Sequence, residues 1–304
     1  MFEFTTRTVA TNETEIVIRV AGAGPPLLLL HDFPQTSLMW RSVAPLLARR
    51  FSVLCADLPG YGQSGCPVST PDHTPYSKRT MARDMVTVME RLGYARFSVA
   101  GHDRGGRVAY RMALHHPEGV VRLALLDIVP TLTAWELADA RFALAFWPWS
   151  LLAQPEPLPE RVLVASADAI VDHALATWGP SPHVLPPEVR GAYIESLTAP
   201  DHAHAICEEY RAAATIDRAH DEADRVSGRR IRCPVLLLWS ADGAVGTWYQ
   251  DRGGPVGVWR AWCDDVQGDE MRSGHFFAGE DPVGGEVGMA VVGAVGQRTG
   301  ELEG

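Results

Sequence analysis

Cysteine is scarce in this chain, which has 304 residues and only five cysteines. They are scattered, odd in number and without a C-x-x-C spacing, so neither a disulfide framework nor a zinc site is expected. The five residues are Cys55, Cys66, Cys207, Cys233 and Cys263. Reduced core cysteines are typical of cytoplasmic proteins. We therefore expect a cytoplasmic protein that holds no metal ion.

A targeting segment and a long apolar run are missing as well. Residues Met1–Thr5 show no basic region followed by an apolar core, which is the pattern of a signal peptide. The longest apolar run nearby, Pro25–Leu30, is far too short to span a bilayer. The sequence therefore predicts no association with a membrane.

The chain also lacks an excess of positive charge, since its formal net charge is −10. This balance argues against a surface that binds nucleic acid or an anionic membrane. An anionic substrate would have to meet a local positive site, since the overall field repels it. The hydrophobic fraction of 46% is that of an ordinary globular protein, long enough for one large domain with an insertion.

Short apolar segments alternate with helical patterns through the first 130 residues. We expect strands at Glu15–Val20, Pro26–Leu30, Phe51–Ala56, Phe97–Ala100 and Arg122–Asp127, and helices at Ser42–Arg49 and Thr80–Leu92. Continuous apolar strands separated by helices indicate a mostly parallel sheet that helices cover on both faces. The sequence therefore predicts an α/β fold.

The pattern changes between about residues 131 and 225, where strand signals vanish and tryptophan, proline and alanine-rich helical segments appear. Strand character returns at Ile231–Trp239. We interpret residues 131–225 as a helical cap, inserted into a core formed by residues 1–130 and 226–304. Such a cap would lie over the carboxyl ends of the strands.

The segment Gly101–Arg107 is the most informative in the chain, because an apolar strand precedes it and a helical pattern follows. Glycines two residues before and two after a central residue are typical of a nucleophile elbow. The central residue is Asp103, where the usual motif has serine. A carboxylate there would attack carbon directly and form an alkyl ester. This indicates hydrolysis at a saturated carbon that bears a leaving group.

Hydrolysis of that ester needs a base, and His275 is the candidate because it lies late in the chain, after the last clear strand. Two aspartates could orient it. Asp127 ends an apolar strand and needs a partner there, whereas Asp242 precedes a glycine in a turn, where aspartate is common. We favour Asp127 as the acid that orients His275, and Asp242 remains the alternative.

Arg104 and Arg107 lie three residues apart on the expected helix, so their side chains share a face beside Asp103. Two guanidinium groups would offset the repulsion between Asp103 and an anionic substrate, and would bind a carboxylate. This indicates a small carboxylate substrate. The backbone N–H groups of Phe33 and Arg104 are the expected oxyanion donors, with a plain turn as the alternative for the Phe33 loop.

Several motifs together resemble one family, the fluoroacetate (haloacetate) dehalogenases of the α/β-hydrolase superfamily. They are His31–Thr36, Asp57–Gly62, Gly101–Arg107, Leu126–Thr131, Trp149–Pro155, Cys207–Arg211 and Ser273–Phe276. The resemblance covers about residues 15–280 and implies the α/β-hydrolase fold without a cofactor. The implied reaction converts a short 2-haloacid, such as fluoro-, chloro- or bromoacetate, to glycolate plus halide through an aspartyl ester.

The resemblance also implies roles for particular residues. Asp103 would be the nucleophile, His275 the base and Asp127 its acid. Arg104 and Arg107 would hold the substrate carboxylate. In the cap, Trp149 and Tyr210 would donate hydrogen bonds to the leaving halide, and Trp178 would line the pocket.

The chain departs from the family at two positions. Asp32 stands where the family usually has glycine, and the sequence leaves open whether its side chain points to solvent or disturbs the oxyanion loop. Pro148 stands where the family usually has a halide-binding histidine. Proline donates no hydrogen bond, and fluoride depends most on such donors, so defluorination is the activity that this change affects.

Two alternatives remain on the sequence alone. An epoxide hydrolase uses the same aspartate and two cap tyrosines, for which Tyr210 and Tyr193 are available, but its neutral substrate fits the two arginines poorly. A hydrolase-fold protein that binds a ligand without catalysis would not need the set of Asp103, His275 and Asp127. The expected partners are a small anionic substrate and a halide, with no nucleic acid and no membrane. The sequence is also compatible with a homodimer.

Overall fold

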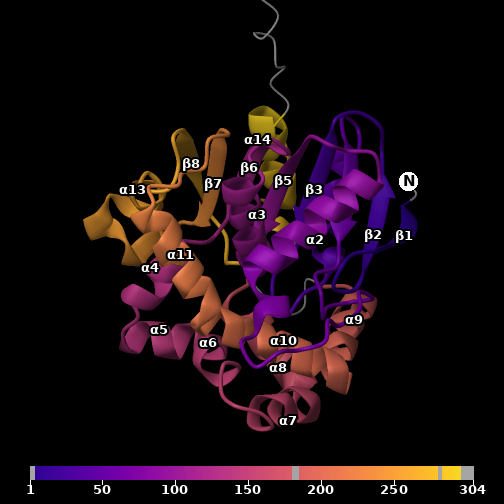
Figure 1. Cartoon of the computed structure of the whole chain (residues 1–304), viewed down its shortest axis with the longest axis vertical. Helices are drawn as coiled ribbons and strands as arrows, with labels where there is room; N and C mark the ends of the chain where they lie inside the picture. Colours follow the sequence, from indigo (N-terminus) through magenta and orange to yellow (C-terminus); the bar gives the residue numbers. More distant parts are fainter. Residues whose placement is uncertain (1–3, 180–184, 280–282, 296–304) are drawn as a thin grey trace, which may run out of the picture.

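The computed structural model describes residues 4–179, 185–279 and 283–295. An eight-stranded sheet runs through the described part, in the order β1-β2-β4-β3-β5-β6-β7-β8 (Figure 1). The strands are β1 (Thr5–Ala10), β2 (Glu15–Ala21), β3 (Pro26–Leu30), β4 (Ser52–Ala56), β5 (Phe97–His102), β6 (Val120–Leu126), β7 (Val235–Ser240) and β8 (Val266–Met271). Strand β2 pairs antiparallel with β1 and β4, and the other pairs are parallel. The predicted mostly parallel sheet is confirmed.

Helices cover both faces of this sheet. In the core they are α1 (Ala44–Leu47), α2 (Lys78–Arg91), α3 (Asp103–His115), α12 (Ala244–Trp248), α13 (Gly254–Trp259) and α14 (Val283–Val295). Short 3-10 helices join them: η1 (Ser37–Arg41), η2 (Thr74–Tyr76), η4 (Gln250–Arg252) and η5 (Phe277–Gly279). In β3, Leu28 and Leu30 pack with α2 and α3, whereas Leu27 and Leu29 pack with α1 and α14. Burial on both faces explains why this strand is apolar at every position.

The two edge strands, β1 and β8, were absent from the sequence-based expectations. Most side chains of β1 are exposed, and β8 carries Gln267, Asp269 and Glu270 at largely exposed positions. An edge strand packs little apolar surface, so it leaves no apolar run in the sequence. Backbone pairing with β7 sets the position of β8 instead.

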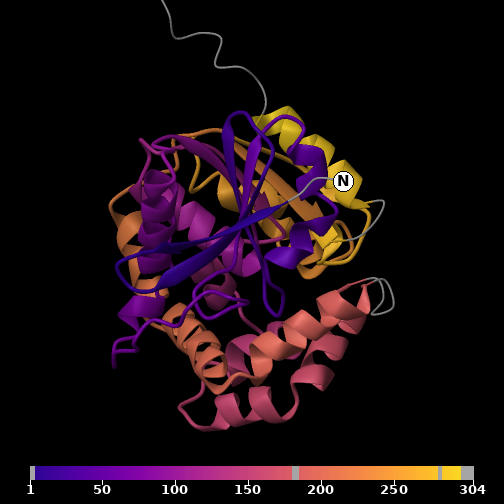
Figure 2. The ribbon, with the colours of Figure 1, turned by 90° about the vertical axis from the view of Figure 1, so that its right-hand side faces the viewer.

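Between β6 and β7 the described residues form helices alone. They are α4 (Thr131–Glu136), α5 (Ala140–Ala145), α6 (Trp147–Leu151), α7 (Leu158–Ala165), α8 (Ala167–Thr177), α9 (Pro187–Thr198), α10 (Pro200–Ala214) and α11 (Ile216–Val226). Figures 1 and 2 show α5 to α10 gathered at one end of the molecule, opposite the end where α14 lies. We propose this helical segment as the cap. None of the helices in the described ranges is both long and apolar enough to cross a membrane.

Candidate active site

Asp103 stands at the sharp turn from β5 to α3, with a backbone φ of 28°. The glycines around it permit this turn. A Cβ on Gly101 would lie 2.5 Å from the carbonyl oxygen of Gly105, and a Cβ on Gly105 would lie 2.5 Å from the backbone of Leu30. Since both contacts are too short for any side chain, only glycine fits there. The turn leaves the Asp103 side chain 15% exposed at the beginning of α3.

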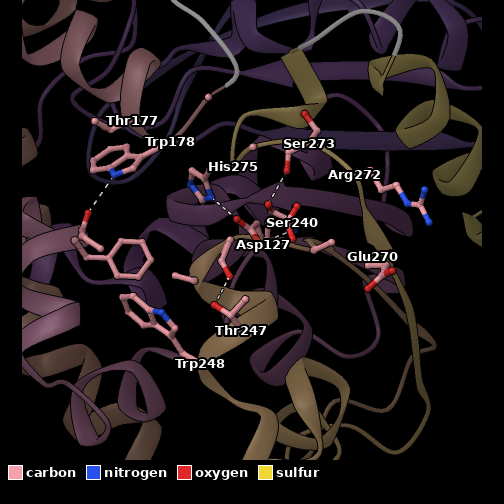
Figure 3. Close-up of a pocket in the computed structure, with 18 residues that line it drawn as sticks. Asp127, Thr177, Trp178, Ser240, Thr247, Trp248, Glu270, Arg272, Ser273 and His275 are labelled. Atoms are coloured by element: carbon pink, nitrogen blue, oxygen red, sulfur yellow. Dashed lines mark hydrogen bonds and ion pairs between the residues drawn. The ribbon is translucent and has the colours of Figure 1, made fainter.

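His275 follows β8 and joins Asp127, which follows β6. Its Nδ1 lies 2.5 Å from Oδ2 of Asp127, and Oδ1 of Asp127 accepts a hydrogen bond of 3.0 Å from the Ser240 backbone N–H (Figure 3). The structure thus places Asp127, rather than Asp242, beside the histidine. Burial alone would lower the pKa of His275, but hydrogen bonds with Asp127 and Asp32 raise it well above its ordinary value.

Arg107 contacts Asp103 from the next turn of α3. Its Nε donates to Oδ1 of Asp103 at 3.1 Å, and its Nη1 donates to Val129 O and Thr131 Oγ1. Burial alone would raise the pKa of Asp103, but Arg107, His275 and Arg104 outweigh burial and hold that pKa below its usual range. The nucleophile candidate is therefore ionised at neutral pH.

Arg104 has a different environment from the one expected. It is fully buried, and its Nε donates to Oε1 of Glu209 in α10 at 2.8 Å. Glu209 also accepts from Tyr61 Oη at 2.8 Å and lies 2.6 Å from Lys78 Nζ. Burial alone would raise the pKa of Glu209, but Arg104 and Lys78 lower it to about 2. Arg104 is therefore already paired with a carboxylate, although its Nη1 has no hydrogen-bond partner among the described residues.

The cap aromatics lie against these arginines. The Arg104 guanidinium lies 4.0 Å from the ring centroid of Tyr210, and that of Arg107 lies 4.5 Å from the ring centroid of Trp149. Both aromatic side chains are almost fully buried. Trp178 instead donates its Nε1–H to Ala145 O and lies near His275, with ring centroids 6.4 Å apart.

Asp32 points inward, which settles the question that the sequence left open. It is 1% exposed, and its Oδ2 lies 3.0 Å from His275 Nε2. Its Oδ1 accepts the Phe33 backbone N–H at 2.5 Å, so this expected oxyanion donor is already occupied. Burial, with the charge of Asp103, raises the pKa of Asp32 to about 8. The sequence did not indicate the contacts of Asp32 and Glu209. Asp32 stood out there only because the family usually has glycine at this position.

His102 completes a small cluster with Asp32 and His275. It is fully buried, and neither ring nitrogen has a hydrogen-bond partner among the described residues. The three residues bring a carboxylate oxygen and two imidazole nitrogens within 4.8 Å of one another, a donor set that could hold a divalent cation. However, Asp32 Oδ2 and His275 Nε2 already face each other at hydrogen-bond distance.

A cavity of about 840 Å³ adjoins the histidine. Asp127, Trp178, His275 and Glu270 are among its lining residues (Figure 3). Asp242 lines it as well. The remaining sequence-predicted residues do not line it: Phe33, Asp103, Arg104, Arg107, Trp149 and Tyr210. The predicted site is thus divided, with the base at the cavity wall and the nucleophile with its arginines packed under the cap aromatics.

Comparisons with known proteins agree with this architecture. A family model described as "alpha/beta hydrolase fold" matches residues 25–264. The structure of ALR0039 from Nostoc sp PCC 7120 superposes with a TM-score of 0.92 at 44% identity, covering 97% of this chain and 99% of that one. The chain therefore belongs to the α/β-hydrolase superfamily.

Two curated relatives refine this assignment. A fluoroacetate dehalogenase from Burkholderia sp is 42% identical over 284 residues, which are 93% of this chain and 91% of the relative. A soluble epoxide hydrolase from Corynebacterium sp. (strain C12) is 30% identical over 86% of this chain and 87% of the relative. Within the superfamily, the chain belongs to the fluoroacetate dehalogenase family, as its motifs indicated.

Proposed function

We propose that this protein is a hydrolytic dehalogenase of short 2-haloacids. The observation that carries the proposal is the contact between Asp103 and Arg107, a carboxylate nucleophile with a guanidinium 3.1 Å away. A carboxylate alone would repel an anionic substrate, whereas the adjacent cation compensates for this repulsion. The similarity to a fluoroacetate dehalogenase supports the same substrate class.

In the first step, a carboxylate oxygen of Asp103 attacks the carbon that bears the halogen. The new C–O bond forms as the carbon–halogen bond breaks, and the halide leaves with the bonding electron pair. Arg107 would bind the substrate carboxylate, with Arg104 adding positive charge while Glu209 holds it in place. Trp149 and Tyr210 would donate hydrogen bonds to the departing halide.

In the second step, water hydrolyses the Asp103 ester. His275 would take a proton from water at Nε2, and the hydroxide would add to the ester carbonyl carbon. Asp127 would stabilise the imidazolium through its 2.5 Å contact with Nδ1. Collapse of the tetrahedral intermediate releases glycolate, whose alkoxide oxygen takes the proton from His275, and the new Asp103 carboxylic acid loses its own proton to restore the carboxylate.

Epoxide hydrolysis is the second candidate. The hydroxyl of Tyr193, on α9 of the cap, is buried without a hydrogen-bond partner among the described residues, and Tyr210 lies close to Arg104. Two cap tyrosines could protonate an epoxide oxygen after attack by Asp103. The curated epoxide hydrolase relative favours this reading, whereas Arg107 beside the nucleophile favours an anionic substrate.

Halide release from fluoro-, chloro- and bromoacetate tests the proposal, with an uncharged aryl epoxide as the alternative substrate. We expect halide release and no diol. The His275→Asn variant should carry an ester on Asp103, detected as added mass on the intact protein, and Asp103→Asn should stay unmodified. Diol formation without halide release would favour the epoxide hydrolase. No reaction with either substrate would indicate a binding protein.

A further inference from the structure

Asp32 contacts two groups that ester hydrolysis requires, so this inference rests on the proposed function. Its Oδ2 lies 3.0 Å from His275 Nε2, where a general base must hold the attacking water. Its Oδ1 accepts the Phe33 N–H, one of two donors expected to bind the developing oxyanion. The Asp32 side chain therefore engages both the proton-accepting nitrogen of His275 and the expected oxyanion donor of Phe33.

We propose that Asp32 is a positioning residue that takes the place of the hydrolytic water, so that hydrolysis of the Asp103 ester becomes the slow step. The enzyme then accumulates as the covalent ester during turnover. Ester formation proceeds normally, and water reaches His275 only when the Asp32 side chain swings away.

The loop around Asp32 holds this arrangement in place. The Asp32 carbonyl accepts from Gln35 N at 3.0 Å and lies 2.8 Å from His31 Nδ1. His31 Nε2 in turn accepts from Leu58 N at 2.9 Å. With its carbonyl oxygen in contact with two groups and 1% of its surface exposed, Asp32 has no solvated position available without movement of neighbouring groups.

A proton between Asp32 and His275 keeps the base occupied. At a separation of 3.0 Å, either Nε2 donates to a carboxylate or a carboxylic acid donates to Nε2. In both arrangements the Nε2 lone pair is unable to accept a proton from water. The same proton does not hinder the first step, because attack by the Asp103 carboxylate on carbon does not use Nε2 of His275.

Rapid-quench measurement of chloride release from chloroacetate tests the proposal. We expect the native enzyme to release about one chloride per active site in a fast burst, followed by slower steady turnover. Intact mass in the steady state should show mainly the esterified protein. In Asp32→Gly the burst should disappear, and steady turnover should rise by about tenfold, as expected for a barrier lowered by about 1.4 kcal/mol.

Two further variants separate this role from a structural one. Asp32→Asn keeps the size and both hydrogen-bonding positions, so its burst should persist. Asp269→Asn removes an exposed carboxylate of β8 that does not line the cavity, and its kinetics should match those of the native enzyme. Circular dichroism of each variant confirms that it is folded.

The outcomes also separate this inference from the proposed function. Steady chloride release without a burst in the native enzyme would overturn the role of Asp32 while leaving the dehalogenase intact. A burst of the same size in the native enzyme and in Asp32→Gly would also overturn the proposed role of Asp32. If Asp32→Gly fails to fold, loss of the burst in Asp32→Ala supports the role and an unchanged burst overturns it. No chloride release by the native enzyme and by Asp32→Gly would instead remove the proposed function itself.

Discussion

Nε of Arg107 donates a hydrogen bond of 3.1 Å to Oδ1 of Asp103, one turn earlier on α3. The turn that exposes Asp103, the proposed nucleophile, therefore also determines where its counter-charge lies, since residues four apart on a helix share a face. Arg104, on the same helix, already forms an ion pair with Glu209. We therefore propose Arg107 as the main cation for the proposed anionic substrate, which leads to a first prediction.

Replacing Arg107 with leucine should raise KM for chloroacetate strongly, because one cation is lost between two carboxylates. We expect a cost of about 2–4 kcal/mol in kcat/KM, as for removal of one partner of a desolvated charge pair. Steady-state chloride release measures it. Arg107→Lys keeps the positive charge, so its kcat/KM for chloroacetate should fall less than that of the leucine variant. Equal turnover of chloroacetate and chloroacetamide by the native enzyme would contradict an anionic substrate.

Pro148 should make fluoride a poor leaving group. It is buried directly before Trp149 at the N-terminal turn of α6, and it offers no hydrogen-bond donor. A donor to charge that develops in the transition state contributes about 2.7–4 kcal/mol. We expect chloro- or bromoacetate to react faster than fluoroacetate, and Pro148→His to narrow the difference. Halide release from the three substrates measures this effect.

The Pro148→His substitution is compatible with the local backbone. The Pro148 carbonyl accepts from Leu152 N at 2.8 Å, and histidine preserves that bond. Proline near a helix start removes an N–H that would have no intrahelical partner. Native fluoride release as fast as chloride release would show that another donor serves the halide, and the argument from Pro148 would then be wrong.

Glu209 should be a major contributor to stability, because it is fully buried between Arg104 and Lys78. Glu209→Gln leaves both cations without their carboxylate, and we expect the free energy of unfolding to fall by about 3–5 kcal/mol at pH 7. Urea denaturation measures the difference. Glu222→Gln, at an exposed position of α11, should change stability by less than about 0.5 kcal/mol.

The pH dependence of that difference has a definite sign. The folded-state pKa of Glu209, about 2, lies below the value near 4.3 of an unfolded glutamate. Its contribution is therefore fully present above the unfolded value and is lost as pH falls toward the folded value. The stability gap between native protein and Glu209→Gln should narrow below about pH 4.3. A gap that widens on acidification would contradict the ionised state of Glu209.

Ester hydrolysis should accelerate on the alkaline side of neutrality, where His275 loses its proton, because Asp127 and Asp32 hold the pKa of His275 well above its ordinary value. Until that proton is lost, Nε2 of His275 donates to Oδ2 of Asp32 and cannot accept a proton from water. The groups whose charge acts on Asp32, or is acted on by it, are Asp103, His102, His275, Tyr193 and Tyr210.

Steady turnover of chloroacetate from pH 6 to about 10 checks this prediction in native enzyme and in Asp32→Gly. The rise should come at lower pH in Asp32→Gly than in the native enzyme, because His275 of the variant lacks one of the two carboxylates that raise its pKa. An identical rise in both proteins would assign the titration to another group.

The sequence by itself determined the central part of the fold and the order of the site. Gly101 and Gly105 predicted the turn that carries Asp103, because close backbone contacts at these positions exclude any side chain. Strands buried on both faces appeared as apolar runs, since each position packs against a helix. Asp127 and His275 were found because they follow a strand or lie late in the chain.

Tertiary structure alone decided which charges meet. Glu209 lies 105 residues from Arg104 in the sequence, and Asp32 lies 243 residues from His275, so no local pattern relates either pair. The exposed edge strands β1 and β8 likewise depend on pairing with a neighbour rather than on their own side chains. Local sterics and periodicity act over a few residues, whereas the partner of a buried charge depends on how the cap and the sheet pack together.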